Sequence, residues 1–366
     1  MYQPLKGIKV LTIEQAVAAP FATARMADAG AKVLKVERPE GDFARGYDKA
    51  ANGLSSYFVW LNRGKKSVVL DLTKKTDRVT IEKEIETSDI FVQNLRYGAL
   101  SKLGLNLKHL HAINPRLISC SLSGFGQKGL MVNRKAYDLL IQAETGLASI
   151  TGGENEAARV GISIVDIATG ATAYSACLEA LIQRGITGKG TTIEISLFDV
   201  MAEWLTVPLL NHEAGNSPKR MGLAHPSIAP YGVFKPKSGP DILLAVQSER
   251  EWLNFCKIVL EDTSLASNPK YCSNVARVSN RLRTDKIVKR VIENLTNEEA
   301  INKLQDADIA FALLNDMEGL STHPCLRRVN IQTDRGSISI PAPPVIFNGT
   351  ERSLASVPSL KPKNKI

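Results

Sequence analysis

The start of the chain places an apolar strand pattern, a helical pattern and a second apolar strand pattern in quick succession. Ile8–Ile13 is a β-branched apolar run, Pro20–Ala29 suits a helix, and Ala31–Glu37 is a second strand. Strand, helix and strand within about 30 residues form a βαβ unit, whose connection brings the two strands together in parallel. The chain is therefore expected to fold around a parallel sheet covered by helices.

The same alternation continues over roughly the first two hundred residues, which predicts one Rossmann-like α/β domain. Further strands are expected at Ser67–Leu72, Ile90–Gln93, Arg116–Leu122 and Thr192–Ile195, and helices near residue 60 and at Asp77–Glu86, Tyr137–Thr145, Ser163–Arg184 and Leu197–Asn211.

The pattern changes after this point, where Gly215–Pro230 is rich in glycine, proline and charge and is typical of a linker or functional loop. A smaller α+β domain is expected beyond it. The predicted boundaries are a large domain at 1–212 that the C-terminal segment 330–366 completes, a linker at 213–228, and a small domain at 229–325. The elements expected there are a hairpin of Tyr231–Lys235 and Ile242–Gln247, helices at Glu249–Leu260, Val275–Asn294 and Asn297–Asp306, and a late hairpin of Asn330–Thr333 and Ser337–Ile340.

Composition excludes several classes of protein. No run of about 18 apolar residues exists, so no membrane span is expected, and the first residues have no apolar signal core, which favours a cytoplasmic protein. The five cysteines and five histidines are scattered without metal-ligand spacing, so no metal is expected. The net charge is +9, but the basic residues alternate with acids, which argues against nucleic acid as a partner.

The loop after the first strand, Glu14–Pro20, contains no glycine. A dinucleotide fold needs a glycine-rich turn there, and the chain also has no phosphate-binding P-loop motif and no nucleophile elbow. Ordinary NAD, ATP and hydrolase functions are therefore not expected.

Polar and basic residues gather where the predicted strands end. In open α/β sheets the ligand binds outside the carboxyl ends of the strands, and basic loops that meet there favour a phosphate-bearing anion. The segments concerned are Glu37–Arg45, Asn62–Ser67, Asn94–Gly98 and Ser121–Gly129.

Asp166 is the acid of most interest, because it lies at the start of the long predicted helix. Ser163 and Asp166 have the spacing of a capping box, so Asp166 is either a helix cap or a functional group. A helix N-terminus favours the ionised carboxylate, which is the form that attacks a carbonyl carbon. The small residues that follow, such as Gly170, suit close approach of either a ligand or another helix.

An ordered set of motifs over nearly the whole chain resembles the family III coenzyme A transferases, which include formyl-CoA transferase and the carnitine CoA transferases. The motifs are Leu5–Leu11, Pro20, Ala27–Pro39, Gly41-Asp42 with Arg45, Asn62–Ser67, Leu70–Leu72, Asn94 with Gly98, Leu103–Leu105, Asn114–Ile118, Ser123–Gly126, Tyr137-Asp138 with Gln142-Ala143 and Gly146, Asp166 with Gly170, and Gly188–Gly190.

The resemblance implies a mechanism and a set of site residues. Asp166 falls on the nucleophile, which would form first an acyl anhydride and then an aspartyl-CoA thioester. Coenzyme A or acyl-CoA would be a substrate, with no permanently bound cofactor, and the second partner would be a small carboxylic acid. The residues implied for CoA binding are Arg38, Leu70, Asn94, Lys102, Lys135 and Tyr137.

The resemblance also implies a homodimer of two interlocked subunits, in which residues 325–345 lead the chain back to the large domain. Gly222–Pro226 is the candidate lid that would exclude water from the intermediates. A short dicarboxylate is the favoured acyl group, with Arg45 and Arg63 as possible contacts or, equally, as surface ion pairs.

Some positions depart from the family pattern. Thr73, Leu95–Tyr97 and Leu130 replace residues usual in the family, and no run of consecutive glycines covers the thioester, so formyl-CoA or oxalate chemistry is not expected. An acyl-CoA racemase remains an alternative, although Tyr137 stands where those enzymes carry a histidine. The third possibility is a non-catalytic CoA-binding protein, against which the intact Asp166 argues.

Overall fold

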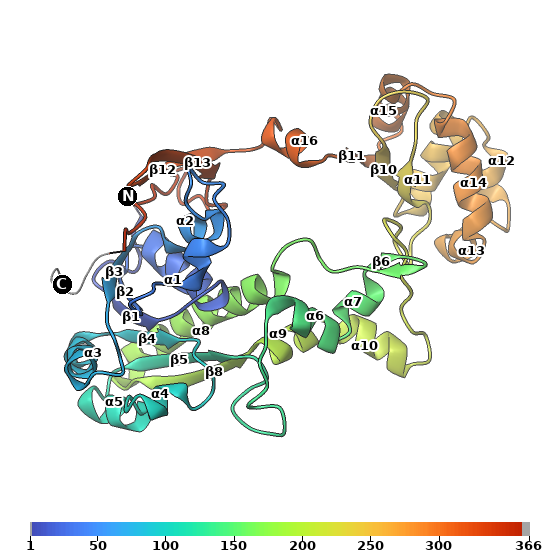
Figure 1. The fold of residues 1–366 in the computed structure, drawn as a ribbon. Helices are drawn as coiled ribbons and strands as arrows, with labels where there is room; N and C mark the ends of the chain where they lie inside the picture. The colour runs from blue at the N-terminus through green and yellow to red at the C-terminus, as the bar shows by residue number, and fades with distance from the viewer. Residues whose placement is uncertain (1, 361–366) are drawn as a thin grey trace. The chain divides into compact units, whose positions relative to one another are not determined.

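The computed structural model describes residues 2–360, which form two compact units (Figure 1). The first unit contains the chain up to Ala148, Arg159–Leu210 and the segment from Arg327 onward, and the second contains Ser149–Ala158 and Asn211–Leu326. The sequence had placed 149–158 with the large domain; these residues group with the second unit. Residues 361–366, which the prediction assigns to the large domain, lie outside the described residues.

The first unit is built on a six-stranded sheet of order β3-β2-β1-β4-β5-β8, in which every neighbouring pair is parallel. This is the doubly wound order in which the chain moves outward from β1 first in one direction and then in the other. The α/β fold class is therefore confirmed. The strands are β1 (Lys9–Ile13), β2 (Lys32–Glu37), β3 (Lys65–Val69), β4 (Ile90–Gln93), β5 (Ile118–Ser123) and β8 (Thr191–Ser196).

Helices cover both faces of this sheet, which explains why its central strands are apolar on both sides. On one face Ile81 and Ile85 are fully buried against β-strand residues such as Phe91. On the other face, α1 packs on β2 and α8 on β5 and β8 (Figure 1). The first face carries α3 (Lys75–Thr87), α4 (Ala99–Lys102) and α5 (Leu107–Ile113), and the second carries α1 (Ala18–Asp28) and α8 (Ile164–Thr187).

Close packing of α1 on α8 depends on Gly170. A Cβ atom at this position would lie 2.5 Å from the carbonyl oxygen of Ala18 and 2.9 Å from Cβ of Phe21. Both distances are shorter than real carbon contacts allow. Gly170 therefore serves the packing of these helices, one of the two roles open to the small residues after Asp166.

One predicted helix of the first unit, Leu197–Asn211, is interrupted. It forms two helices, α9 (Leu197–Trp204) and α10 (Thr206–Glu213), with Leu205 between them. Pro208 explains the break, because its ring would clash with the carbonyl of Trp204 in a continuous helix. The other elements here are a 3₁₀ turn at Phe43–Gly46, α2 (Ser56–Asn62), α6 (Asp138–Glu144), α7 (Leu147–Ile150), and the late hairpin of β12 (Arg328–Thr333) and β13 (Gly336–Pro341).

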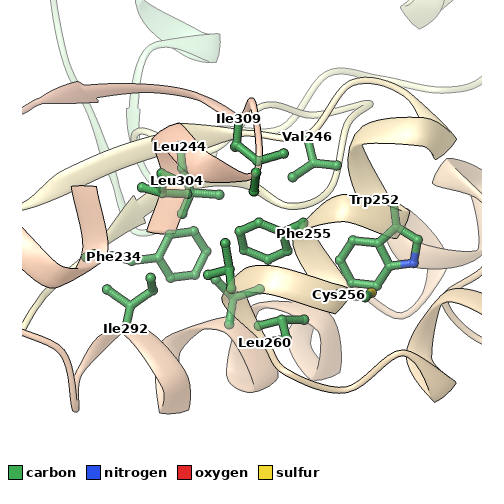
Figure 2. Packing of buried hydrophobic residues seen from close by; sticks show 14 of the residues in the cluster. Phe234, Leu244, Val246, Trp252, Phe255, Cys256, Leu260, Ile292, Leu304 and Ile309 are labelled. Carbon is green, nitrogen blue, oxygen red and sulfur yellow. The ribbon is translucent and has the colours of Figure 1, made fainter. Parts of the chain in front are cut away.

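The second unit has its own sheet, of order β11-β10-β9, and its own core. The predicted hairpin is present as β9 (Tyr231–Phe234) and β10 (Ile242–Ala245), and an unpredicted strand, β11 (Ala310–Leu313), pairs with β10. Figure 2 shows the rings of Phe234, Trp252 and Phe255 among aliphatic side chains of this core.

Helices complete the second unit, and one of them differs from expectation. The helix predicted at Val275–Asn294 is divided at Asn280, whose side chain donates to the carbonyls of Ala276 and Lys270 and so competes with helical pairing. The elements are β6 (Gly152–Gly153), β7 (Glu156–Ala157), α11 (Glu249–Asn254) with a π turn at Phe255–Val259, α12 (Ser264–Ser267), α13 (Asn274–Ser279), α14 (Arg281–Ile292), α15 (Asn297–Asp306) and α16 (Met317–Ser321).

Candidate active site

Two cavities lie in the first unit at the carboxyl edge of its sheet. The larger, the Asp166 cavity, has a volume of about 630 Å³ and is lined by the loops after β1, β4, β5 and β8. The smaller, the Arg38 cavity, has a volume of about 500 Å³ and is lined by the loops after β1, β2 and β3. Gln15 and Leu95 line both. Three of the four predicted segments thus converge on one edge, at the point where strand order reverses between β1 and β4, whereas Asn62–Ser67 leads into β3 and lines neither cavity.

The loop after β1 is held in an uncommon conformation between the two cavities. Ala16 has a φ of 63°, in the left-handed region that costs a residue with a side chain roughly 1 kcal/mol. Three hydrogen bonds hold it: the Ala16 amide donates to Asp42 Oδ1 at 3.2 Å, and Asn94 both accepts from the Gln15 amide at 3.0 Å and donates to its carbonyl at 2.8 Å. Asn94 therefore positions this loop.

A buried ionic network supports the same loop from within the unit. Lys65 donates to Glu14 at 2.6 Å, Lys35 donates to Asp42 at 2.6 Å, and Asn62 Oδ1 accepts from both lysines at 2.9 and 3.2 Å. All four charged side chains are fully buried. Burial lowers the pKa of Lys65 to about 8, while for Glu14 the opposing effect of burial is outweighed by Lys65 and Lys35, which hold its pKa below the usual range. Both partners therefore stay charged at neutral pH.

Asp166 lies in the first turn of α8 and lines the larger cavity. The capping-box role that its spacing allowed is not realised, because Ser163 makes no side-chain cap bond. Asp138 caps the helix instead: its Oδ1 accepts from the amides of Val165 at 2.8 Å and Asp166 at 3.2 Å. The carboxylate of Asp166 is thereby left available to the cavity.

The surroundings of Asp166 make its proton unusually hard to remove. Burial, and after it the negative charge of Asp138, raises the pKa of Asp166 to about 7. At neutral pH the carboxyl therefore exists in comparable amounts as acid and as carboxylate. A carboxylate with little solvation and a raised pKa is a stronger nucleophile than an exposed one, which suits attack on a thioester carbonyl.

The structure distributes the predicted binding residues over both cavities. Arg38 and Leu70 line the smaller cavity, and Asn94, Lys135 and Tyr137 line the Asp166 cavity. Lys102, at the end of α4, lines neither.

The arginines considered for acyl recognition are engaged elsewhere. Arg45 forms a two-bond ion pair with Glu37, at 2.7 and 2.8 Å, and this pair outweighs the effect of burial and lowers the pKa of Glu37 to about 2. Arg63 pairs with Asp28 at 2.5 and 3.1 Å. Neither arginine lines the Asp166 cavity, and both form ion pairs, although these are with buried carboxylates rather than at the surface.

Sequence reasoning assigned no role to several residues that line the Asp166 cavity, among them Gln15, Tyr47, Asp138 and Arg159. Burial, together with the charges of Asp42 and Asp166, raises the pKa of Tyr47 to about 12, so its hydroxyl keeps a proton to donate. The position of Asp138 just after Tyr137 was visible in the sequence, but its contact with the start of α8 joins residues far apart in the chain.

Metal and membrane features were searched over the described chain. Among residues 2–360 no group of three or more His, Cys, Asp or Glu side chains is placed to hold a metal ion. Within the same range, none of the helices combines the length and apolar character needed to cross a membrane.

Comparison with known proteins gives consistent matches over almost the full chain. A family model described as CoA-transferase family III matches residues 5–362. The chain is 35% identical to a succinyl-CoA:glutarate CoA-transferase of Homo sapiens over 98% of its own length and 83% of that protein. It is 30% identical to an acetyl-CoA:oxalate CoA-transferase of Acetobacter aceti over 94% and 90%. A crystal structure of a CaiB/BaiF family protein from Brucella suis superposes with a TM-score of 0.85 at 30% identity, covering 98% of this chain and 97% of that one.

Proposed function

Because the chain belongs to CoA-transferase family III, we propose that it moves CoA from an acyl-CoA to a free dicarboxylic acid through covalent intermediates on Asp166. The chain is an enzyme of the CoA-transferase type. The observation that carries the proposal is the carboxylate of Asp166, which lines the larger cavity while Asp138 takes over the capping of its helix.

The first half of the reaction would consume the donor. The ionised Asp166 attacks the thioester carbonyl, the carbon–sulfur bond breaks, and a mixed anhydride and CoA thiolate form. The thiolate then attacks the Asp166 carbonyl of the anhydride, which releases the donor acid and leaves an aspartyl-CoA thioester.

The second half would run the same steps in reverse. The acceptor carboxylate attacks the aspartyl-CoA carbonyl and expels the thiolate. That thiolate attacks the acyl carbonyl of the new anhydride, which forms the product acyl-CoA and restores Asp166. Tyr47 lines the same cavity, and its protonated hydroxyl would donate a hydrogen bond to oxygen atoms that gain negative charge in these steps.

CoA would occupy both cavities. The Arg38 cavity suits the nucleotide part, because Arg38 is exposed and its ion pair with Glu40 is long, at 3.9 Å. Lys135 and Tyr137 would lie along the arm that carries the thioester toward Asp166. Gln15 and Leu95, which line both cavities, mark the path between them. Lys102 stays a prediction as a phosphate contact, and Gly222–Pro226 stays a prediction as the lid.

The dicarboxylic acyl group is supported by the relatives, whose names specify succinyl-CoA, glutarate and oxalate as reactants. The interlocked homodimer and the cytoplasmic location stay predictions. Apolar side chains that are exposed in the single chain, such as Ile182 and Ile186 on α8 and Val207 on α10, offer surface that a second copy would cover. The molar mass of the purified protein in solution tests the dimer.

A transfer assay tests the proposed function. The enzyme is mixed with succinyl-CoA and a panel of free acids (glutarate, oxalate, mesaconate and butyrate), and new thioesters are identified by mass spectrometry. We expect new thioesters with glutarate and mesaconate from the wild type, none with oxalate, and none with any acid from Asp166→Ala. Exchange of the donor's α-proton with deuterated water, without formation of any new thioester, would instead support the racemase alternative.

A further inference from the structure

Three arginines line the Asp166 cavity, and they differ in what they contact. Arg134 forms a two-bond ion pair with Glu144 at 2.7 and 3.2 Å. Arg96 donates to the carbonyl oxygen of Asn133 at 2.5 Å and also lines a third cavity, beside Ser121. Arg159 has neither a hydrogen bond nor an ion pair with any residue in the described part of the chain. Its guanidinium therefore keeps all its donors for a ligand.

The segment that carries Arg159 is tied to the backbone of Asp166 by a short hydrogen-bond chain. The amide of Val160, the next residue, donates to Oε1 of Gln142 at 2.9 Å. Gln142 is fully buried and its Nε2 donates to Asp138 Oδ2 at 2.7 Å. The other oxygen of Asp138 accepts from the amides of Val165 and Asp166. One buried glutamine and one carboxylate thus fix the start of α8 and the attachment point of Arg159 together.

A dicarboxylic acyl group presents two chemically different ends to such a cavity. Its thioester must lie at the nucleophile, and its free carboxylate needs a cationic partner away from that point. Guanidinium is the side chain that matches a carboxylate with two parallel hydrogen bonds. A negatively charged ligand end beside Asp166 would be repelled, whereas one beside an unpaired arginine is stabilised.

From these contacts we propose that Arg159 binds the distal carboxylate of the acyl group and so sets the preference of the enzyme for dicarboxylic substrates. The inference rests on the proposed function, since it assumes that the thioester is attacked by Asp166. Arg159 is a specificity residue in this account, because it contacts the far end of the substrate and takes no part in the bonds that form and break.

The expected effect is moderate because Arg159 is exposed and solvent screens its charge. A charge-assisted pair of hydrogen bonds in such a place corresponds to a loss of about ten- to a hundred-fold in kcat/KM on removal. The loss should be confined to substrates with a second carboxylate, since a monocarboxylic acyl group leaves Arg159 in water with or without the ligand.

The test compares succinyl-CoA with butyryl-CoA, which has the same number of acyl carbons and no distal carboxylate. We expect Arg159→Ala to lose about ten- to a hundred-fold in kcat/KM with succinyl-CoA and less than about three-fold with butyryl-CoA. Arg159→Lys, which keeps the charge but not the planar fork, should lie between the wild type and Arg159→Ala. Arg134→Ala is the matched control, because it removes an arginine of the same cavity whose partner is Glu144, and it should affect both donors alike.

Three results would overturn the inference. Equal losses with both donors would indicate a structural role for Arg159, and no loss with either donor would indicate no contact with the acyl group. Loss of the succinyl preference in Arg134→Ala but not in Arg159→Ala would move the role to the control residue. A wild type that transfers CoA from neither donor would overturn the proposed function itself, a result distinct from the other three.

Discussion

Replacing Asp166 by Asn should make the protein more stable, and the gain should grow with pH. The substitution keeps the size of the side chain and removes its ionisation. Below pH 3.8, the ordinary pKa of the group, the carboxyl is neutral in the folded and unfolded chain and costs nothing. As pH rises, the unfolded chain loses the proton first, while the folded chain keeps it until about pH 7. Stability that was present below the unfolded pKa is therefore lost as pH rises through the folded pKa, and the Asn variant escapes that loss.

The magnitude follows from the two pKa values. A pKa of about 7 in place of 3.8 corresponds to an upper bound of about 4 kcal/mol, at about 1.4 kcal/mol for each tenfold change in the acid dissociation constant. Asp166 is only partly buried, so water reduces the cost, and we expect ~1–3 kcal/mol in the free energy of unfolding at pH 8. Most of the gain should develop between about pH 4 and pH 7, with a plateau above that range.

Chemical denaturation of the wild type and Asp166→Asn at several pH values measures the difference in their free energies of unfolding. Asp48→Asn is the control, because hydrogen bonds from the Ser56 amide and its neighbours hold the pKa of Asp48 below its usual range. That variant should lose stability at pH 8, the opposite direction. A gain for Asp166→Asn that is constant with pH, or that shrinks as pH rises, would refute the reasoning.

Three other substitutions test separate parts of the structure. Asp138→Asn removes the negative charge beside Asp166 but leaves the burial of Asp166 unchanged. The midpoint of the pH–rate profile for acylation should therefore move below about 7 without reaching the value of an exposed carboxyl, and an unmoved midpoint would contradict this. Gly170→Ala places a methyl group 2.5 Å from the Ala18 carbonyl and should cost about 1–3 kcal/mol of stability in urea unfolding, whereas Gly185→Ala, at an open position of the same helix, should gain about 0.5–1 kcal/mol. Lys65→Met leaves the buried charge of Glu14 without this partner and should lower the free energy of unfolding by about 3–5 kcal/mol. The double variant with Glu14→Gln should recover part of that loss, and no recovery would argue against the Lys65–Glu14 pair.

The sheet was predictable because its signals are local. Each strand of the six-stranded sheet is a short apolar or β-branched run, and the segments between its successive strands are long enough for the crossover that a parallel pair needs. Two predicted helices proved to be interrupted, each because of a single residue. Pro208 interrupts the helix expected at Leu197–Asn211, and Asn280 divides another. β11 was missed because Ala-Phe-Ala-Leu acquires its strand conformation by pairing with β10.

The site was predictable only in part. Asp166 and its place at a helix start were visible, and so was the family pattern that makes it a candidate nucleophile. Sequence spacing could not show that Asp138, 28 positions away, would take the capping bonds. It also could not separate Arg45 and Arg63, which form ion pairs with carboxylates, from Arg159, which forms none within residues 2–360. Which charges pair is a property of the fold, because partners such as Asp28 and Arg63 meet only across packed elements.

Transfer of heavy oxygen from the acceptor acid to Asp166 tests the central claim most directly. The enzyme is first loaded with succinyl-CoA, then given glutarate labelled with heavy oxygen in both carboxylates, and digested after a single turnover. In the proposed reaction an acceptor oxygen bridges the anhydride and stays on Asp166 when the thiolate takes the acyl group. We therefore predict that the peptide containing Asp166 gains one heavy oxygen atom, and that Asp166→Asn gains none. Formation of glutaryl-CoA with no label on Asp166 would contradict the covalent account.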